Sequence, residues 1–227
     1  MRDYLFNTPY TLEQHPDMYH FSSDSELLGR FIRLTSEDRV LDVGTNNGVL
    51  LCYAAMMKPL SMTGIDLFEE VINTAGNNLG FNHISAELLV CRLQDLRHEP
   101  FTAIIANPPY FVNSNESLKK ANRYLRAARH ADHLSMEDLF FHSARLLADH
   151  GTLSIVYPAQ SREVLDQRAF ENGLSVERFR HVYDHPGGRV LRYLVEYRKG
   201  DSTAARQEAD VFLDRLHTGE SGFELMD

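Results

Sequence analysis

The stretch that decides the fold is Arg39–Val43 (RVLDV), followed directly by Gly44–Gly48 (GTNNG). The first run is short, apolar and rich in valine, which is typical of a buried strand. The second run contains the glycine and asparagine residues that tight turns need. A helix is expected over Val49 to Met57, ended by Pro59. A strand, a turn and a helix in this order predict the first unit of a βαβ fold.

The same alternation of short apolar runs and helical patterns continues toward the C-terminus. Parallel strands need long crossover connections, so this alternation favours a parallel sheet. Further strands are expected over 61–65, 87–91, 102–106 and 152–157. Helices are expected over Glu69–Leu79, Ser135–Ala148 and Ser161–Glu171. The first is closed by Gly80 and the last is stopped by Gly173. The middle helix begins with a capping box of Ser135 and Asp138, and Gly151 lies beyond its end.

Two later segments, Val176–Val182 and Val190–Tyr197, alternate like strands on either side of the turn His185–Gly188. This arrangement predicts an antiparallel hairpin at the edge of the sheet. Together the segments predict a Rossmann-like α/β fold with a mostly parallel, seven-stranded sheet.

Upstream of the first strand, Ser23-Asp24-Ser25-Glu26 matches a helix-start pattern and predicts a helix that runs to about Leu34. We expect one domain over residues 1–200 and an acidic tail over 201–227. The tail is expected to form a short helix from Ala204 to Leu216.

Composition narrows the class of protein. The chain has 227 residues, of which 43% are hydrophobic and 24% charged, so wholesale disorder is excluded. The longest apolar stretch, Val49 to Met57, is far too short to span a membrane, and the first residues lack the apolar core of a signal peptide. Cys52 and Cys91 are the only cysteines and both lie in apolar segments. A reducing, cytoplasmic location is therefore expected.

Charge is distributed unevenly along the chain. The net charge is −9, from 32 acidic and 23 basic residues, and residues 201–227 hold seven of the acids but only two basic residues. The segment from Lys119 to Arg129 contains no acid. It is either a solvated helix face or a patch that contacts phosphates. Its basic residues are Lys119, Lys120, Arg123, Arg126 and Arg129.

The turn after the first strand does not fit the dinucleotide fingerprint G-x-G-x-x-G, because Asn46 and Val49 occupy glycine positions. The pattern D-x-G-x-G-x-G fits better, at Asp42, Gly44 and Gly48, with Asn46 at the second glycine. Asparagine tolerates a positive φ better than most residues. Such a turn allows close approach of the backbone to an uncharged ligand.

Two further acids follow successive predicted strands. Asp66 ends the second strand, 24 residues beyond Asp42, where a carboxylate can accept bonds from two ribose hydroxyls. Asp95 follows the third strand and is placed to accept a bond from an adenine amine. Either acid alone is commonly a cap or turn residue. Together, at one sheet edge, they predict a nucleoside cleft.

The fourth strand is followed by Asn107-Pro108-Pro109-Tyr110. These residues either simply end the strand or carry chemistry, because X-Pro steps break strand pairing. The stiff Pro-Pro step fixes the Pro108 carbonyl and the Asn107 amide as two acceptors, beside an aromatic plate at Tyr110. Two acceptors that pull on an exocyclic amine restore its lone pair for attack on a sulfonium methyl. The tetrapeptide therefore points to amino-methylation.

With the DVGTNNG turn, this NPPY tetrapeptide resembles class I S-adenosylmethionine-dependent amino-methyltransferases, and most closely the bacterial tRNA(Val) adenine-N(6)-methyltransferase family. That family modifies the adenine just 3′ of the anticodon. The resemblance covers about residues 14 to 200. It is carried by NPPYF at 107–111 and by HFSSDSELL at 20–28, ARH at 128–130, LLADHGTLSIVYP at 146–158 and LVEYRKG at 194–200.

The resemblance implies roles for individual residues. Asp42, Gly44 and Gly48 would shape the cofactor turn, in which Asn46 departs from the usual glycine. Asp66 and Leu67 would hold the ribose end, and Asp95 and Leu96 the cofactor adenine. Asn107, Pro108 and Tyr110 would grip the target base beside the cofactor, and Ser22 and Asp24 would close its methionine end.

Two rival functions stay open. An enzyme of the same class would act on a protein glutamine or an rRNA base; DNA fits less well because the chain has no separate target-reading domain. A non-catalytic, cofactor-binding RNA module is the second rival, although Asp66, Asp95 and NPPY are all present. The expected partner is tRNA, with no membrane. His130-Ala131-Asp132-His133 is accompanied by no further ligand cluster in the sequence, so no metal site is expected.

Overall fold

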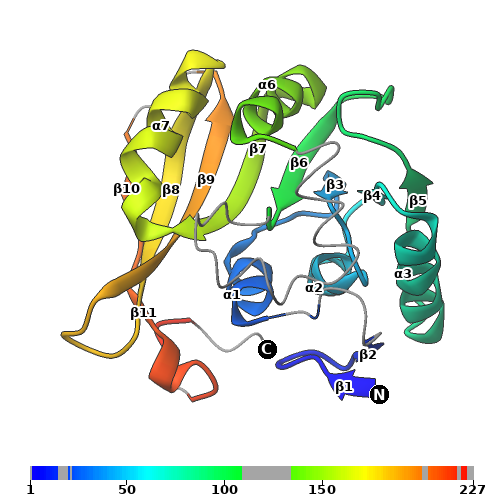
Figure 1. Cartoon of the computed structure of the whole chain (residues 1–227), viewed down its shortest axis with the longest axis horizontal. Helices are drawn as coiled ribbons and strands as arrows, with labels where there is room; N and C mark the ends of the chain where they lie inside the picture. Colours follow the sequence, from blue (N-terminus) through cyan, green and yellow to red (C-terminus); the bar gives the residue numbers. More distant parts are fainter. Residues whose placement is uncertain are drawn as a thin grey trace, which may run out of the picture.

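The computed structural model describes residues 2–14, 20, 22–108, 134–200, 204–218 and 221–223. Seven strands lie side by side in the order β8-β9-β7-β6-β3-β4-β5 (Figure 1). Their bounds are β3 (Arg39–Val43), β4 (Ser61–Asp66), β5 (Glu87–Val90), β6 (Phe101–Ala106), β7 (Leu147–Pro158), β8 (Leu174–Tyr183) and β9 (Val190–Lys199).

The strands β7, β6, β3, β4 and β5 pair in parallel, whereas β9 is antiparallel to both β7 and β8. The prediction of a mostly parallel sheet with an antiparallel hairpin is therefore confirmed. Two short strands extend it: β10 (Arg206–Gln207) and β11 (Val211–Phe212) both pair in parallel with β8. The described sheet thus has nine strands.

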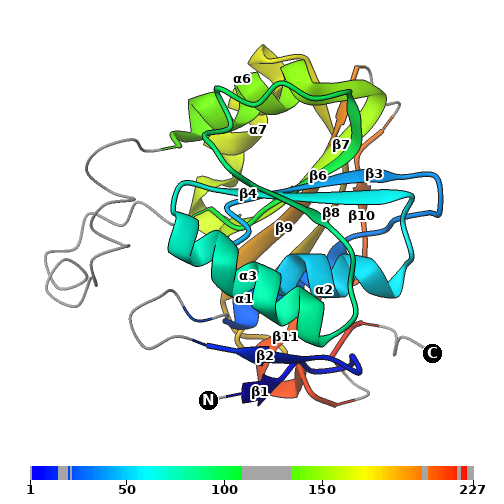
Figure 2. The ribbon, with the colours of Figure 1, turned by 90° about the vertical axis from the view of Figure 1, so that its right-hand side faces the viewer.

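Helices cover both faces of the sheet, as Figure 2 shows edge-on. One face carries α1 (Ser23–Phe31), α2 (Val49–Met56) and α3 (Glu69–Phe81), and the other carries α6 (Met136–Leu146) and α7 (Arg162–Glu171), which follows the short 3-10 helix η1 (Ala159–Ser161). No described helix has the length and apolar character needed to cross a membrane.

Each face of the sheet packs into its own core because successive side chains of a strand point to opposite sides. On β6, Ala103 and Ile105 belong to the core with α1 and α2. Ile104 and Ala106 belong to the core with α6. All four side chains are at most 5% exposed, which explains why this strand is an apolar run without alternation.

The start of α1 differs from the predicted cap. Its N-cap is Ser22, without a side-chain cap hydrogen bond, and the helix ends at Phe31 instead of Leu34. The expected capping residue Ser23 lies inside the helix. With Ser22 as the N-cap, Glu26 lies one position beyond the place of a capping-box acid, and its carboxylate contacts Arg30 at 3.3 Å and the His217 Nε2 of the C-terminal segment at 3.0 Å. Local and tertiary contacts therefore engage the acid of the predicted capping box.

Two other helix ends also shift. Helix α3 passes through Gly80 to Phe81, and the left-handed residue that ends it is His83 (φ 57°). The amide of Ile84 then donates to the Leu79 carbonyl at 2.9 Å, which satisfies a helix-end acceptor. The capping box of Ser135 and Asp138 at the start of α6 is confirmed. That helix ends at Leu146 because β7 begins at the next residue.

The N-terminal segment forms a small hairpin that the sequence did not predict. Its strands are β1 (Arg2–Tyr4) and β2 (Thr11–Glu13). The side-chain amides of two asparagines of α3 form hydrogen bonds with the backbone of β2. The Asn78 amide exchanges two hydrogen bonds with the Glu13 backbone, at 2.8 and 3.1 Å, and Asn82 does the same with Thr11.

The C-terminal segment does not form the expected helix over Ala204 to Leu216. It runs along β8 as β10 and β11 and then forms one 3-10 turn, η2 (Leu213–Arg215). Val211, Leu216 and Phe223 are buried in the core shared with α1. The open edge of β8 thus outweighs the weak helical tendency of this segment.

Candidate active site

The carboxyl ends of the parallel strands bring the predicted site residues to one edge of the sheet. Val43 at the end of β3 lies beside Ile65 on β4 and beside Ala106 on β6. The next residue of each strand is therefore at the same level: Gly44, Asp66 and Asn107. The chain runs from β3 to β4 on one side and returns to β6 on the other, so this edge is a topological switch point, where α/β proteins bind ligands.

The turn after β3 is built from left-handed residues. Gly44, Asn46 and Gly48 have φ values of 71°, 49° and 86°. The amides of Gly44 and Thr45 donate to the Ile65 carbonyl at 3.0 and 2.9 Å, which ties the turn to β4. Asn46 takes the conformation that the usual glycine would supply. The turn therefore forms despite this departure from the pattern.

Asp66 is held in place by the backbone around it. Its carboxylate accepts hydrogen bonds from the amides of Leu67 (2.7 Å), Phe68 (3.3 Å) and Asn46 (3.3 Å). Burial raises the pKa of this carboxyl above its ordinary value, and the three amides oppose that shift. The side chain is only partly covered, so it is a fixed acceptor at the rim of the turn.

Asp42 lies beneath the turn and is fully buried. The Thr45 hydroxyl donates to its Oδ2 at 2.8 Å, whereas its Oδ1 has no hydrogen-bond partner. Burial is the main cause that raises the pKa of Asp42 to about 7, with a smaller contribution from the charge of Asp66. A carboxyl with one unused oxygen beneath the turn supports the turn and can also accept a bond from a ligand.

The edge next to β5 combines an acid with apolar side chains. Asp95 is exposed on the loop after β5, while its neighbour Leu96 is buried in the core on the α6 side. Leu67 and Val90 are 36% and 50% exposed, and Val90 pairs with Asp66 across the sheet. The sequence analysis did not single out Val90. Its position at the end of the strand that follows Asp66 could have indicated that it lies near this edge. Leu67 and Val90 therefore leave apolar surface exposed beside Asp66.

Asn107 follows β6 directly and contacts helix α1. Its Nδ2 donates to the Ser25 Oγ at 3.2 Å, so its carbonyl oxygen is turned away from Ser25. Pro108 is buried. Sequence analysis did not assign Ser25 a role, because nothing in the sequence places α1 beside β6. Tyr110 and the basic residues of 119–129 lie outside the described residues.

The N-terminus of α1 supplies two more polar groups. The Ser22 Oγ is buried without a hydrogen-bond partner. Asp24 instead forms an ion pair with Arg192 of β9 at 2.9 Å. The structure therefore keeps Ser22 available for a ligand, whereas it engages Asp24 in a contact between α1 and the sheet.

Comparison with known families decides which class this arrangement belongs to. The family model of the methyltransferase small domain, which describes the family's sequences, matches residues 11–176, more than half of the chain. This chain belongs to the methyltransferase small domain family. The methyltransferase prediction is therefore confirmed.

Two curated relatives of this methyltransferase are both named tRNA1(Val) (adenine(37)-N6)-methyltransferase. The protein of Parabacteroides distasonis is 31% identical over 77% of this chain and 74% of its own length. The protein of Vibrio campbellii is 32% identical over 78% and 75%. Among solved structures, the 16S rRNA N2 G1207 methyltransferase of T. thermophilus is 16% identical, with a TM-score of 0.64, over 88% of this chain and 50% of its own. That likeness confirms the fold.

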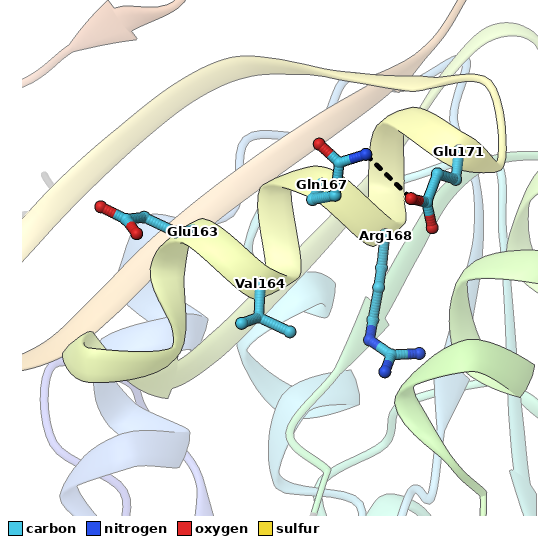
Figure 3. A pocket seen from close by; sticks show the side chains of 5 residues that line it. All are labelled: Glu163, Val164, Gln167, Arg168 and Glu171. Carbon is cyan, nitrogen blue, oxygen red and sulfur yellow. Dashed lines mark hydrogen bonds between the residues drawn. The ribbon is translucent and has the colours of Figure 1, made fainter.

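A shallow hollow elsewhere on the methyltransferase is not part of this site. It is lined by Glu163, Val164, Gln167, Arg168 and Glu171, all from α7, and Gln167 donates to Glu171 within it at 2.8 Å (Figure 3). A hollow formed by one helix is a surface groove. Within the described part of the chain, no three His, Cys, Asp or Glu side chains are grouped to hold a metal ion, and the motif at 130–133 lies outside that part.

Proposed function

We propose that this methyltransferase transfers a methyl group from S-adenosylmethionine to the exocyclic amine of an adenine in tRNA. The adenine we assign is the one at position 37 of tRNA1(Val), next to the anticodon. The support for the substrate is that two tRNA1(Val) (adenine(37)-N6)-methyltransferases are 31% and 32% identical to this chain over more than three quarters of its length. A reducing, cytoplasmic setting follows from that substrate.

The site fits a nucleoside cofactor. The unused Oδ1 of Asp42 and the unpartnered Ser22 Oγ are buried polar atoms that require a partner. Asp66 is fixed by three backbone amides and would accept bonds from the ribose hydroxyls. Asp95 and the apolar Leu67 would border the adenine, with Leu96 beneath. When bound, S-adenosylmethionine supplies an electrophilic methyl group on a sulfonium.

Asn107 would orient and activate the target amine. Its carbonyl oxygen and that of Pro108 would accept hydrogen bonds from the two hydrogens of the adenine N6. These bonds favour a pyramidal nitrogen whose lone pair attacks the methyl carbon as the C–S bond breaks, and the leaving electron pair stays on sulfur. The excess proton of the product is then released to water. Orientation and charge stabilisation would supply the rate without a dedicated base.

Two further parts of the proposal concern RNA. Tyr110 would stack on the target base after that base has left its loop. Lys119, Lys120, Arg123, Arg126 and Arg129 would contact the phosphate backbone, which positions RNA without reading its sequence. A net charge of −9 leaves the protein little general attraction for a polyanion, so local basic groups would have to supply it.

The observation that carries this proposal is the fixed Asn107 amide at the switch point beside Asp66, in a chain of the methyltransferase small domain family. The test is incubation with labelled S-adenosylmethionine and total tRNA, total rRNA or protein extract, followed by nucleoside and amino-acid analysis. Label in N6-methyladenosine from tRNA supports the proposal. Label in protein glutamine or only in rRNA contradicts its substrate, and no transfer contradicts the reaction.

A further inference from the structure

A row of side chains crosses the carboxyl edge of the sheet on the face covered by α6 and α7. On β7, Tyr157 lies directly across from Tyr193 of β9, and Tyr193 lies across from His181 of β8. The pairing of Ala106 with Ile155 places Pro108, two residues further on, level with Tyr157. Three strand spacings, about 14 Å, therefore separate Pro108 from His181.

Arg162 ends this row and is held flat against it. Its guanidinium carbon lies 4.4 Å from the ring centre of Phe179 and 5.0 Å from that of Tyr193. The Nη1 lies 3.1 Å from the His181 Nε2, and the Nε lies 3.5 Å from Asp166. Ring stacking and two polar contacts fix the orientation of a side chain that is nevertheless 38% exposed.

The surrounding charges leave the guanidinium as the dominant cation of this cluster. A guanidinium can only donate, so the His181 Nε2 accepts from Arg162; burial and the charge of Arg162 lower the pKa of His181, and Asp210 opposes this shift. Asp166 also accepts from the hydroxyls of Tyr193 and Tyr197, which spreads its charge over several donors.

We propose that Arg162 binds a backbone phosphate of the RNA. This phosphate lies a short distance along the RNA chain from the base that enters the site. A planar cation that is pre-oriented on aromatic rings suits a phosphate, because its fork offers parallel N–H donors and little side-chain entropy is lost on binding. Arg162 lies against the same carboxyl edge of the sheet as Pro108, through its contacts with His181 and Tyr193, and this connects it to the reaction. This inference rests on the proposed RNA substrate.

The test compares charge variants of α7 in their affinity for tRNA. Arg162→Met keeps an apolar stem over Phe179 and Tyr193 but removes the charge. Arg168→Met is the matched control, since Arg168 lies on the same helix, is similarly exposed and pairs with Glu137. We measure tRNA affinity by fluorescence anisotropy over a range of salt concentrations, in the presence of S-adenosylhomocysteine. Thermal melting and cofactor affinity report the state of the fold.

Arg162→Met is expected to weaken tRNA binding about tenfold and to reduce the salt slope by about one phosphate contact. Arg168→Met should keep the affinity within about twofold of the parent. If Arg162→Met does not fold, Arg162→Lys should keep the salt slope and lose only part of the affinity. If the Arg162 variants bind tRNA with the same affinity and the same salt slope as the parent, this inference alone is overturned. A parent protein that neither binds nor methylates tRNA overturns the proposed function as well.

Discussion

At the scale of single residues, Asp66 links the structure of the turn to the expected ribose contact. Its carboxylate already accepts three backbone hydrogen bonds, so Asp66→Ala would disturb the turn as well as the ligand. Asp66→Asn is the sharper change, since it keeps the shape and one acceptor oxygen but removes the charge.

Asp66→Asn is expected to weaken S-adenosylmethionine binding by about 30- to 900-fold, because hydrogen bonds to a charged acceptor contribute about 2–4 kcal/mol in total. Isothermal calorimetry measures this affinity directly. Asp38→Asn is a control, because Asp38 lies before β3, at the opposite end of the strand. An Asp66→Asn variant that binds the cofactor as tightly as the parent would remove Asp66 from the cofactor site.

The buried carboxyl of Asp42 predicts a dependence of stability on pH. Because the pKa in the folded protein is raised to about 7, the folded state keeps a proton that the unfolded chain releases near its ordinary pKa of 3.8. The contribution of Asp42 to stability is therefore fully present below pH 4 and is lost as the pH rises to about 7. The loss is on the order of 4 kcal/mol at most.

Asp42→Asn mimics the protonated carboxyl and should remove this dependence. The free energy of unfolding of the variant minus that of the parent should increase between pH 4 and pH 7 and then stay constant. Urea titrations at several pH values measure this difference, in which the titration of all other groups largely cancels. A difference that does not change with pH would contradict a raised pKa at Asp42.

Asn107 is the residue on which the proposed chemistry depends. Asn107→Ala should slow methyl transfer by about 100-fold or more, as expected when one transition-state partner is lost. Ser25→Ala, which removes only the hydroxyl that accepts from Asn107, should slow it less. Single-turnover rates at saturating cofactor and tRNA measure both effects. An Asn107→Ala rate equal to that of the parent, in a folded variant, would exclude the proposed role.

At the scale of elements, α3 connects the N-terminal hairpin to the turn after β3 through one buried amide. Asn78 bonds to both backbone groups of Glu13 and donates to the Asn47 carbonyl at 2.9 Å. Its loss would leave the buried Asn47 carbonyl and the two partly buried backbone groups of Glu13 without this partner, and a buried group without a partner is costly. The stability of the hairpin and of the turn are therefore coupled.

Asn78→Ala is expected to lower the free energy of unfolding by about 2–4 kcal/mol. Asn77→Ala is the matched control on the exposed side of the same helix and should change it by less than about 0.5 kcal/mol. Chemical denaturation of both variants gives the comparison. Equal stability of the two variants would show that the Asn78 contacts contribute nothing.

The elements also show what sequence can and cannot predict. The unit β3–turn–α2 was predictable because an apolar run, turn residues and a helical run follow one another within Arg39–Met57. The strands β10 and β11 could not be predicted from the sequence, because each has only two residues and depends on the open edge of β8. The contact of Ser25 with Asn107 spans 82 positions, so no local pattern signals it.

At the scale of the whole molecule, the strand order explains why the site lies where it does. The strands β4 and β6 lie on opposite sides of β3, so the connections from the carboxyl edge run in opposite directions, and the turn, Asp66 and Asn107 all lie at this edge. The described tail residues pair with β8, at the edge of the sheet opposite β5, and Glu208 forms ion pairs with Arg178 and Arg180 of β8. We propose that residues 1–200 carry the reaction and that the described tail residues stabilise α1 and β8.

The central claim is the methylation of one adenine amine in tRNA. The most direct measurement uses two unmodified tRNA1(Val) transcripts that differ only in adenine or guanine at position 37, each incubated with the parent protein and S-adenosylmethionine. Mass spectrometry of the digested RNA then locates any added methyl group. We predict one methyl group on the N6 of adenine 37 and none on the guanine transcript. Equal methylation of both transcripts, or of neither, would contradict the account.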